Sequence, residues 1–271
     1  LCKNQPMKIY FVDSFTNEKF KGNPAAVCLP DVALADDIMQ KIATEIGFSE
    51  TAFTRQIDGN TYSIRFFTPK MEIPLCGHAS LASAKIIFDS SKMDHIKFIN
   101  RNNVEIFVEK SGNKISMQFP IYETEAIEVP RQMLEALGIS AVVDKRYSPN
   151  NKIILIEIKD AAELARLTPD FAALVNSYTG INGVLITAVS NSEGVDFHYR
   201  YFWPWAGTNE DPVTGGVQTF LTKYWATKLN KTRLTAYQSS LRTGTMTTML
   251  LADKVCIAGE AVTVLEGQFI V

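Results

Sequence analysis

Cysteine and histidine are scarce in this sequence, and the few that occur are scattered. The cysteines and histidines of the 271-residue chain are Cys2, Cys28, Cys76, Cys256, His78, His95 and His198. No C-x-x-C pair is present, which argues against a disulfide framework and favours a reducing compartment, so we expect a cytoplasmic protein. Zinc sites normally draw Cys and His ligands clustered at short spacing, so we expect no metal.

Long apolar runs and blocks of basic residues are also missing. No run approaches the roughly 18 apolar residues of a membrane helix, and the opening "LCKNQPMKIYFVD" lacks the regions of a signal peptide. The formal net charge is −2 and charged residues make up 21%, so we expect neither nucleic acid nor a membrane surface as partner. Because Met7 opens a strand-like stretch, residues 1–6 are interpreted as an extension outside the fold.

The sequence is rich in short β-like runs of valine, isoleucine and aromatic residues. Strands are expected at 8–12, 25–29, 51–55, 62–67, 96–99, 104–108, 115–119, 153–158, 184–189, 195–202, 246–251, 255–258 and 262–265. Helical patterns are expected at 37–46, in the run after Cys76, and at 131–137, 161–166 and 213–229. Strands outnumber helices and do not alternate with them, which predicts an α+β fold.

A weak internal repeat divides the chain. "RFFTP" at 65–69 has a counterpart, "RYFWP", at 200–204, and each precedes a loop and a small-residue helix start, "CGHASLASA" and "TGGVQTFLTKYW". Chance resemblance is the alternative, but the order favours two related lobes, each a strand-rich sheet on a central helix. We expect an N-terminal lobe at 7–118, joined by the final strand 264–271, and a C-terminal lobe at 119–263.

The two helix starts carry glycines that would let a ligand approach the backbone closely. These are Gly77 in the first half and Gly215 and Gly216 in the second. The first turn of a helix has unpaired N–H groups and a partial positive charge. If the halves face each other, their helix ends would hold a carboxylate or a developing enolate. The alternative is that the glycines only cap and pack the helices.

Two carboxylates are candidates for proton transfer. Glu50 lies between Phe48 and Phe53, where desolvation would raise its pKa, unless it is a solvated turn or helix-capping residue. Asp211 precedes Pro212, which holds it extended just before the second helix; an N-cap is the alternative.

The first helix start adds an imidazole and a thiol. His78 is expected to hold a neutral ring, because the helix dipole disfavours its cation, or else to be a core histidine. Cys76 could be activated as a thiolate. The repeat matches Cys76 to Thr214, whose hydroxyl is a poor base, so a two-thiol racemase is disfavoured.

Five motifs in fixed order resemble the PhzF-like family, named for the isomerase of phenazine biosynthesis. They are "VDSFTNEKFKGNPAAVCL", "FSETAF", "RFFTPKMEIPLCGHASLASA", "AGTNEDPVTGG" and "QSSLRTG". The resemblance implies the diaminopimelate epimerase fold, with two pseudo-symmetric lobes, a site between them, and no metal or organic cofactor. It also implies that Glu50 is the base and that His78 and Asp211 assist. Asn23 and the glycines at the second helix start, Gly215 and Gly216, would bind substrate. A homodimer is compatible with it.

The expected function is therefore a cofactor-independent isomerase acting on a small unsaturated carboxylate through Glu50. An epimerase or racemase with a second base is one alternative, and a non-catalytic interaction protein is another. The family commonly shows G-S-A-H after E-D-P-V-T, where this chain has Gly215-Gly216-Val217-Gln218, so a hydroxyl and an imidazole are missing there. This departure leaves the substrate open.

Overall fold

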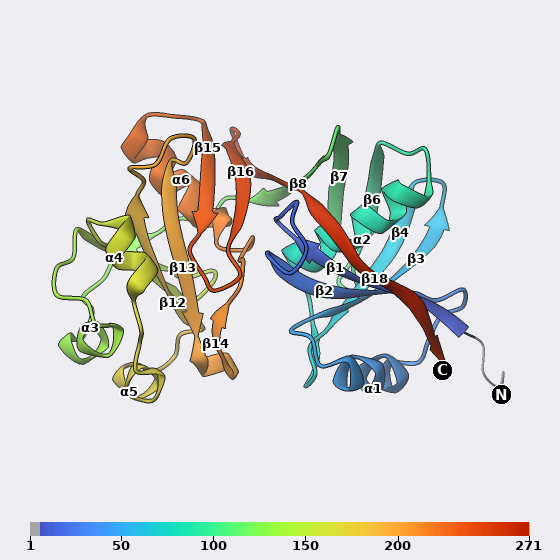
Figure 1. Cartoon of the computed structure of the whole chain (residues 1–271), viewed down its shortest axis with the longest axis horizontal. Helices are drawn as coiled ribbons and strands as arrows, with labels where there is room; N and C mark the ends of the chain where they lie inside the picture. Colours follow the sequence, from blue (N-terminus) through green and yellow to red (C-terminus); the bar gives the residue numbers. More distant parts are fainter. Residues whose placement is uncertain (1–5, 271) are drawn as a thin grey trace. The chain divides into compact units, whose positions relative to one another are not determined.

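The computed structural model describes residues 6–270, which form two compact units (Figure 1). The first unit contains the chain up to Phe119 and returns from Cys256 onward, whereas the second is Pro120–Val255. The returning segment thus begins at Cys256 and not at residue 264. Residues 1–5 of the expected extension lie outside the described residues, and Pro6 already belongs to the first strand. No helix among the described residues is long and apolar enough to cross a membrane.

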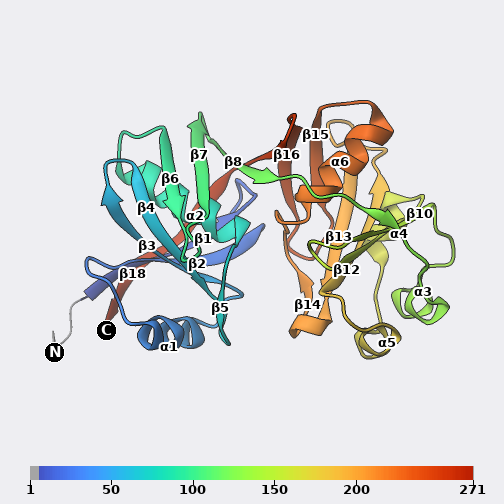
Figure 2. The ribbon, with the colours of Figure 1, turned by 180° about the vertical axis from the view of Figure 1, so that it is seen from behind.

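The first unit is one curved sheet that surrounds a helix (Figures 1 and 2). Its strands are β1 (Pro6–Ser14), β2 (Asn23–Leu29), β3 (Thr51–Asp58), β4 (Thr61–Phe67), β5 (Glu72–Ile73), β6 (His95–Ile99), β7 (Glu105–Ser111), β8 (Lys114–Pro120), β17 (Lys254–Gly259) and β18 (Ala261–Ile270). The strand β1 lies between β18 and β2, and pairing continues through β3, β4, β6, β7 and β8 to β17. The β2–β3 and β4–β6 pairs are parallel.

Helix α2 (Gly77–Ser90) is the central helix of the first unit. It packs against β1, β2, β3 and β18. Its sequence is apolar or small on most sides, which is typical of a largely buried helix, and only its C-terminal part reaches solvent, through the Lys85–Asp89 ion pair. The buried residues are His78, Ala79, Ser80, Leu81, Ala82, Ser83, Ala84, Ile86, Ile87 and Phe88.

Helix α1 (Asp36–Ile46) is amphipathic and buries Met39, Ile42 and Ala43. These side chains pack with Met7, Ile9, Cys28, Phe53 and Phe67. Gly47 ends the helix with a left-handed φ of 73°, as the sequence Ile-Gly predicts. The chain then reaches β3 within a few residues, and Glu50 stands immediately before that strand.

The second unit repeats the plan. Its strands are β9 (Glu125–Ala126), β10 (Asp144–Ser148), β11 (Ile153–Glu157), β12 (Gly183–Val189), β13 (Phe197–Trp203), β14 (Thr208–Asp211), β15 (Arg233–Gln238) and β16 (Gly244–Leu250). Parallel pairs again join β11 to β12 and β13 to β15. The central helix is α6 (Gln218–Leu229), which packs on β15 and β16.

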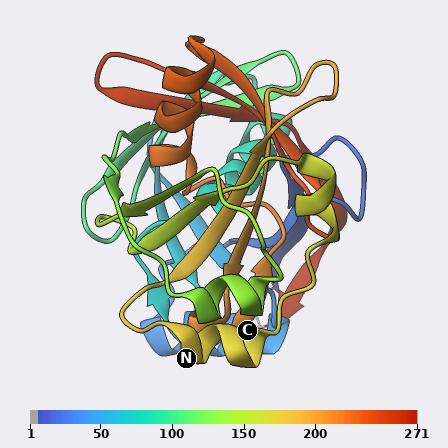
Figure 3. The same cartoon turned by 90° about the vertical axis from the view of Figure 1, so that its left-hand side faces the viewer.

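Three short helices, α3 (Arg131–Leu137), α4 (Ala161–Arg166) and α5 (Phe171–Ser177), complete the second unit. Helices α3 and α5 lie side by side (Figure 3). They form a separate apolar core with β11 and β12. The helices contribute Met133, Leu137 and Leu174, and the strands contribute Ile154 and Ile186.

The predicted repeat is confirmed, and with it the fold of two pseudo-symmetric lobes. The β1–β2–α1–β3–β4–β5–α2–β6–β7 series corresponds to β10–β11–α4–α5–β12–β13–β14–α6–β15–β16, with parallel pairs at the same two places. From arginine to helix-start glycine the spacing is 12 residues in the first copy and 15 in the second. The difference lies before Glu72 and Glu210, where the second copy has a short 3₁₀ helix, Pro204–Ala206.

The predicted helix at 213–229 begins too early. Regular helix starts at Gln218, and the chain enters it through a tight turn in which Gln218 N–H donates to the Gly215 carbonyl (3.0 Å). Adjacent glycines carry a large entropic cost in a helix, which favours this late start. Sequence patterns also missed α5, β10, β14 and β15, because these segments are short or mix polar and apolar residues.

Candidate active site

A buried ion pair joins Glu50 and His78 in the first unit. The distance from His78 Nε2 to Glu50 Oε2 is 3.0 Å, and the two side chains are only 7% and 6% exposed. Asn23 places its carboxamide nitrogen 3.2 Å from the other ring nitrogen, Nδ1. Three residues that the sequence singled out are therefore in contact, although they are distant in the chain.

Local structure explains this meeting. Asn23 is the first residue of β2, and Glu50 immediately precedes β3, which runs parallel to β2; the Glu50 carbonyl accepts from Ala26 N–H (3.2 Å). His78 is the second residue of α2, and its own carbonyl accepts from the Ser14 hydroxyl (2.8 Å) at the end of β1. Two neighbouring strands and the start of the central helix thus supply the polar groups.

Glu50 is buried, as expected, and the flanking Phe48 and Phe53 pack against Phe11 and Phe67. Burial alone would raise the pKa of Glu50, but the His78 charge, with hydrogen bonds from His78 and Ser49, lowers it below its usual range. The expected raised pKa was wrong because the sequence could not show the imidazole.

The expected neutral ring of His78 was also wrong. Burial disfavours the imidazolium, but the Cys76 sulfur and the Glu50 carboxylate raise the pKa of His78 well above its ordinary value. The helix dipole is outweighed because two anionic or polarisable groups lie in contact with the ring. Both shifts favour a carboxylate beside an imidazolium.

Cys76 is the N-cap residue of α2 and lies against the same ring. Its Sγ is 3.5 Å from His78 Nδ1 and 3.8 Å from Nε2. Burial raises the pKa of this thiol, which favours the protonated form over the activated thiolate that a helix start can produce. Gly77 follows as the first residue of α2, and no side chain caps the helix there.

Asp211 lies in the second unit, at the end of β14 and well before α6. It is 7% exposed and accepts a short hydrogen bond from the Thr214 hydroxyl. The N-cap interpretation of Asp211 is therefore wrong, because its carboxylate serves a turn within the loop. Thr214 stands at the position that corresponds to Cys76, as the repeat predicted.

Gln238 holds the loop that carries Asp211. This residue is fully buried; its Nε2 donates to the Asp211 carbonyl (2.6 Å), and its Oε1 accepts from Thr214 N–H (2.7 Å). Ser240 adds a bond from its hydroxyl to the Pro212 carbonyl (2.5 Å). Sequence reasoning gave these residues no role, although both belong to the quoted "QSSLRTG" motif.

The same kind of support exists in the first unit. Asn100 corresponds to Gln238 in the strand register, and its Nδ2 donates to the Pro74 carbonyl (2.7 Å). "EIPLCG" at 72–77 and "EDPVTG" at 210–215 are thus equivalent loops, each held by a carboxamide. Asn100 and Gln238 correspond only through the strand register, so the sequence alone gave no signal for Gln238.

Gly215 and Gly216 lie just ahead of α6 and not in its first turn. Their carbonyls accept from Gln218 N–H (3.0 Å) and Thr219 N–H (3.4 Å). A Cβ added to Gly216 would meet nothing within 4 Å, so this backbone is open to approach. Gly216 can therefore expose backbone polar groups, whereas Gly215 is buried, and both glycines precede the helix that was expected to contain them.

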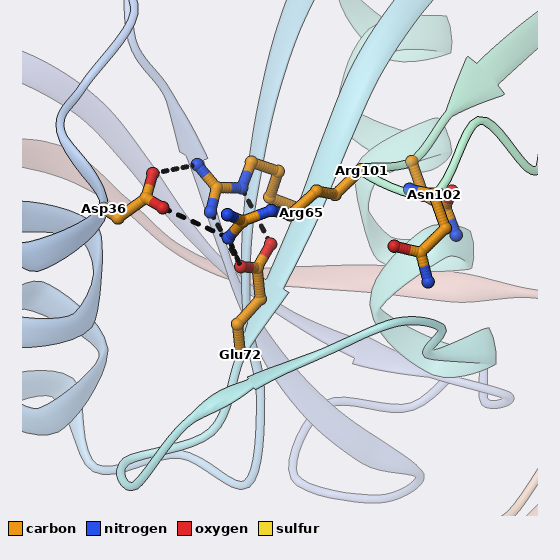
Figure 4. Close-up of polar contacts among 6 residues, drawn as sticks. Asp36, Arg65, Glu72, Arg101 and Asn102 are labelled. Carbon is orange, nitrogen blue, oxygen red and sulfur yellow. Dashed lines mark hydrogen bonds and ion pairs between the residues drawn. The ribbon is translucent and has the colours of Figure 1, made fainter.

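Each loop is preceded by a bidentate Arg–Glu pair. Arg65 Nε and Nη2 donate to Glu72 (2.8 and 2.7 Å), and Arg200 Nε and Nη2 donate to Glu210 (2.7 and 2.8 Å). In the first unit Arg101 and Asp36 extend the pair into a four-residue network (Figure 4). These pairs fix the hairpins from which the loops start.

Comparison with known proteins identifies the family. A family model described as phenazine biosynthesis-like protein, PhzC-PhzF, matches residues 12–267. The chain belongs to this family. An uncharacterized isomerase of Halalkalibacterium halodurans is 40% identical over 270 residues, which cover 97% of this chain and 98% of the relative.

Solved structures agree with this assignment. A PhzF-family protein from Enterococcus faecalis has a TM-score of 0.91 and 36% identity, covering 98% of this chain and 100% of that one. A hydroxyproline epimerase from Agrobacterium vitis shares the fold alone, with a TM-score of 0.60 and 10% identity over 100% of this chain and 93% of that one. The chain is a PhzF-like isomerase with the diaminopimelate epimerase fold.

Proposed function

We propose that this PhzF-like isomerase moves a proton on a small unsaturated carboxylate, with Glu50 as the single base and no organic cofactor. The observation that carries the proposal is the buried Glu50–His78 pair at the start of α2. The lowered pKa of Glu50 favours the ionised carboxylate that a general base must present, and it also makes that carboxylate a weaker base.

His78 supports both halves of the reaction. When Glu50 takes a proton from the carbon next to a conjugated carboxylate, its charge is lost and its interaction with the imidazolium weakens. That loss favours return of the proton to another carbon on the same face of the substrate. The Nε2–H of the imidazolium, with Nε2 3.0 Å from the carboxylate oxygen, donates to Glu50 and keeps the carboxylate oriented.

The remaining polar groups would bind the substrate and stabilise its enolate-like intermediate. Asn23 would hold the imidazolium in place with its carboxamide oxygen turned to accept from Nδ1–H, while Gly77, Gly215 and Gly216 would offer backbone groups to an anion. Asp211 would assist by hydrogen bonding, with its orientation fixed by Thr214 and its backbone by Gln238.

Proton NMR in deuterated water tests the proposal. The panel contains a cyclohexadiene carboxylate, an alkylidene succinate and 4-hydroxyproline. We expect one member to show a moved double bond with deuterium at the new carbon, and Glu50→Gln to slow this by roughly 10²–10⁴-fold, the usual contribution of a positioned base. Glu45→Gln, on the exposed face of α1, is the matched control.

The same experiment separates isomerisation from epimerisation. Stereoinversion with deuterium at a single carbon and no shifted double bond would indicate an epimerase with a second base. Full activity in Glu50→Gln, with Glu45→Gln also active, would remove Glu50 from the mechanism.

A further inference from the structure

The position of the base in the first unit has a counterpart in the second. The motifs "RFFTP" and "RYFWP" align Phe66 of β4 with Tyr201 of β13. Each of these pairs, on the neighbouring strand, with the residue two positions after Glu50 and Gly183, respectively. Glu50 and Gly183 are therefore equivalent, and the second unit has no side chain at the position of the base.

The hydroxyl of Tyr201 lies at this vacant position. A Cβ added to Gly183 would lie 2.6 Å from the Tyr201 ring and 2.7 Å from its hydroxyl oxygen. The first unit has the buried Phe66 at the position of Tyr201, so the fold requires only an aromatic ring there. The hydroxyl is an addition that the architecture itself does not need.

This hydroxyl is also without a partner. Tyr201 is 5% exposed, and its hydroxyl makes no hydrogen bond with any of residues 6–270. Tyr199, on the same face of β13, donates its hydroxyl to the Thr214 carbonyl (3.2 Å). Burial and the charge of Asp211 raise the pKa of Tyr201, which favours the protonated donor form. A largely buried donor with no acceptor in the protein indicates that a ligand supplies one.

The chain leaves space for that ligand at the start of α6. The alignment of "EIPLCG" with "EDPVTG" places Gly216 at the position of His78. In the first unit His78 Nε2 lies 3.0 Å from Glu50. In the second unit a Cβ on Gly216 would meet nothing within 4 Å. The second unit thus has a donor at the place of the carboxylate and open space at the place of the imidazole.

We propose that Tyr201 is a substrate-binding residue, whose hydroxyl donates a hydrogen bond to a substrate carboxylate that lies beside Gly216. This inference rests on the proposed function and adds a contact to it. The unpaired N–H groups at the start of α6 add further donors to the anion. When a proton leaves the neighbouring carbon, negative charge spreads onto the carboxylate, so the same hydrogen bond stabilises the enolate-like intermediate.

The negative charge of Asp211 lies on the other side of Tyr201. Asp211 pairs with Tyr201 across β13 and β14, where the first unit has the apolar pair of Phe66 and Ile73. Strand β12, which carries Gly183, pairs with the opposite edge of β13. Because the hydroxyl lies against Gly183, it is directed toward β12 and away from β14. An anion can therefore accept from Tyr201 on the side that is remote from Asp211.

Fluorine NMR tests the contact with a carboxylate that cannot react. 4-Fluorobenzoate is titrated with the full chain, and broadening of its fluorine signal gives the dissociation constant. We expect Tyr201→Phe to weaken binding by about 10–100-fold, the usual effect of one hydrogen bond to a charged group. Its thermal unfolding midpoint should equal that of the wild type, because no hydrogen bond within the protein is lost. Gly216→Leu should remove binding by filling the space.

Tyr237→Phe is the matched control. Tyr237 is half-buried on β15, and its hydroxyl likewise makes no hydrogen bond in the described part of the chain. It pairs with His198 of β13, and these two side chains lie on the opposite face of the sheet from Tyr201. Tyr237→Phe should bind 4-fluorobenzoate as the wild type does.

The possible outcomes separate this contact from the isomerisation. No binding to the wild type, or equal binding by Tyr201→Phe and the wild type, would overturn the contact. Binding that depends on Tyr201, with no proton exchange in any member of the substrate panel, would support the contact and contradict the proposed function. Turnover of a panel member with an unchanged kcat/KM in Tyr201→Phe would leave the isomerisation in place and remove Tyr201 from it.

Discussion

Single side chains decide the electrostatics of Glu50 and His78. The sequence indicated correctly that Glu50 is shielded from solvent, since it is 5% exposed. It could not indicate the ionisation states, because these depend on a ring that arrives from another element. Predicting a pKa from flanking residues fails wherever the contacting charge is distant in the chain.

Gln238 holds the loop around Asp211 through two buried hydrogen bonds. We predict that Gln238→Met lowers the free energy of unfolding by about 2–4 kcal/mol, since it leaves the Asp211 carbonyl and the Thr214 N–H buried without a partner. Urea unfolding measures the change.

Thr248→Val is the matched control in the same unit. Thr248 is fully buried, and its hydroxyl has no hydrogen-bond partner among residues 6–270. Its replacement should cost less than about 1 kcal/mol, because no bond is lost. Equal effects of the two substitutions would mean that the Gln238 hydrogen bonds contribute little to stability.

At the scale of elements, the strands and long helices followed from side-chain periodicity, whereas the helix starts did not. The α2 start at Gly77 agrees with the sequence, but α6 begins later than predicted because its glycine-rich entry forms a turn. The contact between Asn23 and His78 required α2 to pack on β2, which no local pattern encodes.

The β1–β2 connection depends on Gly22, which directly precedes Asn23. Gly22 has a φ of +66°, and a Cβ there would lie 2.2 Å from the Ser14 carbonyl oxygen. We predict that Gly22→Ala destabilises the protein by more than ~2 kcal/mol and displaces Asn23 from His78, because both backbone conformation and space oppose the methyl group.

Gly47→Ala separates the two causes. Gly47 has a similar φ of +73°, but a Cβ there meets nothing within 4 Å. Only the conformational cost remains, about 1 kcal/mol. Thermal unfolding compares the variants, and an equal loss in both would show that the clash at Ser14 is relieved without cost.

For the whole molecule, two short motifs predicted the internal repeat. The family resemblance then predicted the fold of two pseudo-symmetric lobes. The duplicated Arg–Glu pairs and carboxamides were not readable, since their bonding partners become equivalent only once strand register is known. The two units also differ in the ion pairs that their equivalent arginines form. The first has the four-residue network of Asp36, Arg65, Glu72 and Arg101, whereas Arg200 in the second bonds Glu210 and two backbone carbonyls.

This difference predicts that acid destabilises the first unit through Glu72. Hydrogen bonds from Arg65 hold the pKa of Glu72 below its ordinary value. A carboxyl group with a lower pKa in the folded state stabilises the fold fully above its unfolded pKa of about 4.3, and that contribution is lost as pH falls through the lower folded value. We expect Glu72→Gln to cost about 1 kcal/mol at pH 7, after solvent screening, and to flatten the loss of stability between about pH 5 and pH 3.

Urea midpoints measured across that pH range provide the test, with hydrogen exchange to locate the change. Glu18→Gln is the control. The Glu18 side chain is 63% exposed and pairs with Lys21, so its replacement should leave the pH dependence of stability nearly unchanged. Because Glu72 joins β5 to β4, Asp36 begins α1 and Arg101 follows β6, acid-induced exchange should rise first in these elements. Exchange that rises first in the second unit, or an unaltered acid profile in Glu72→Gln, would show that the network does not set the acid stability of the protein.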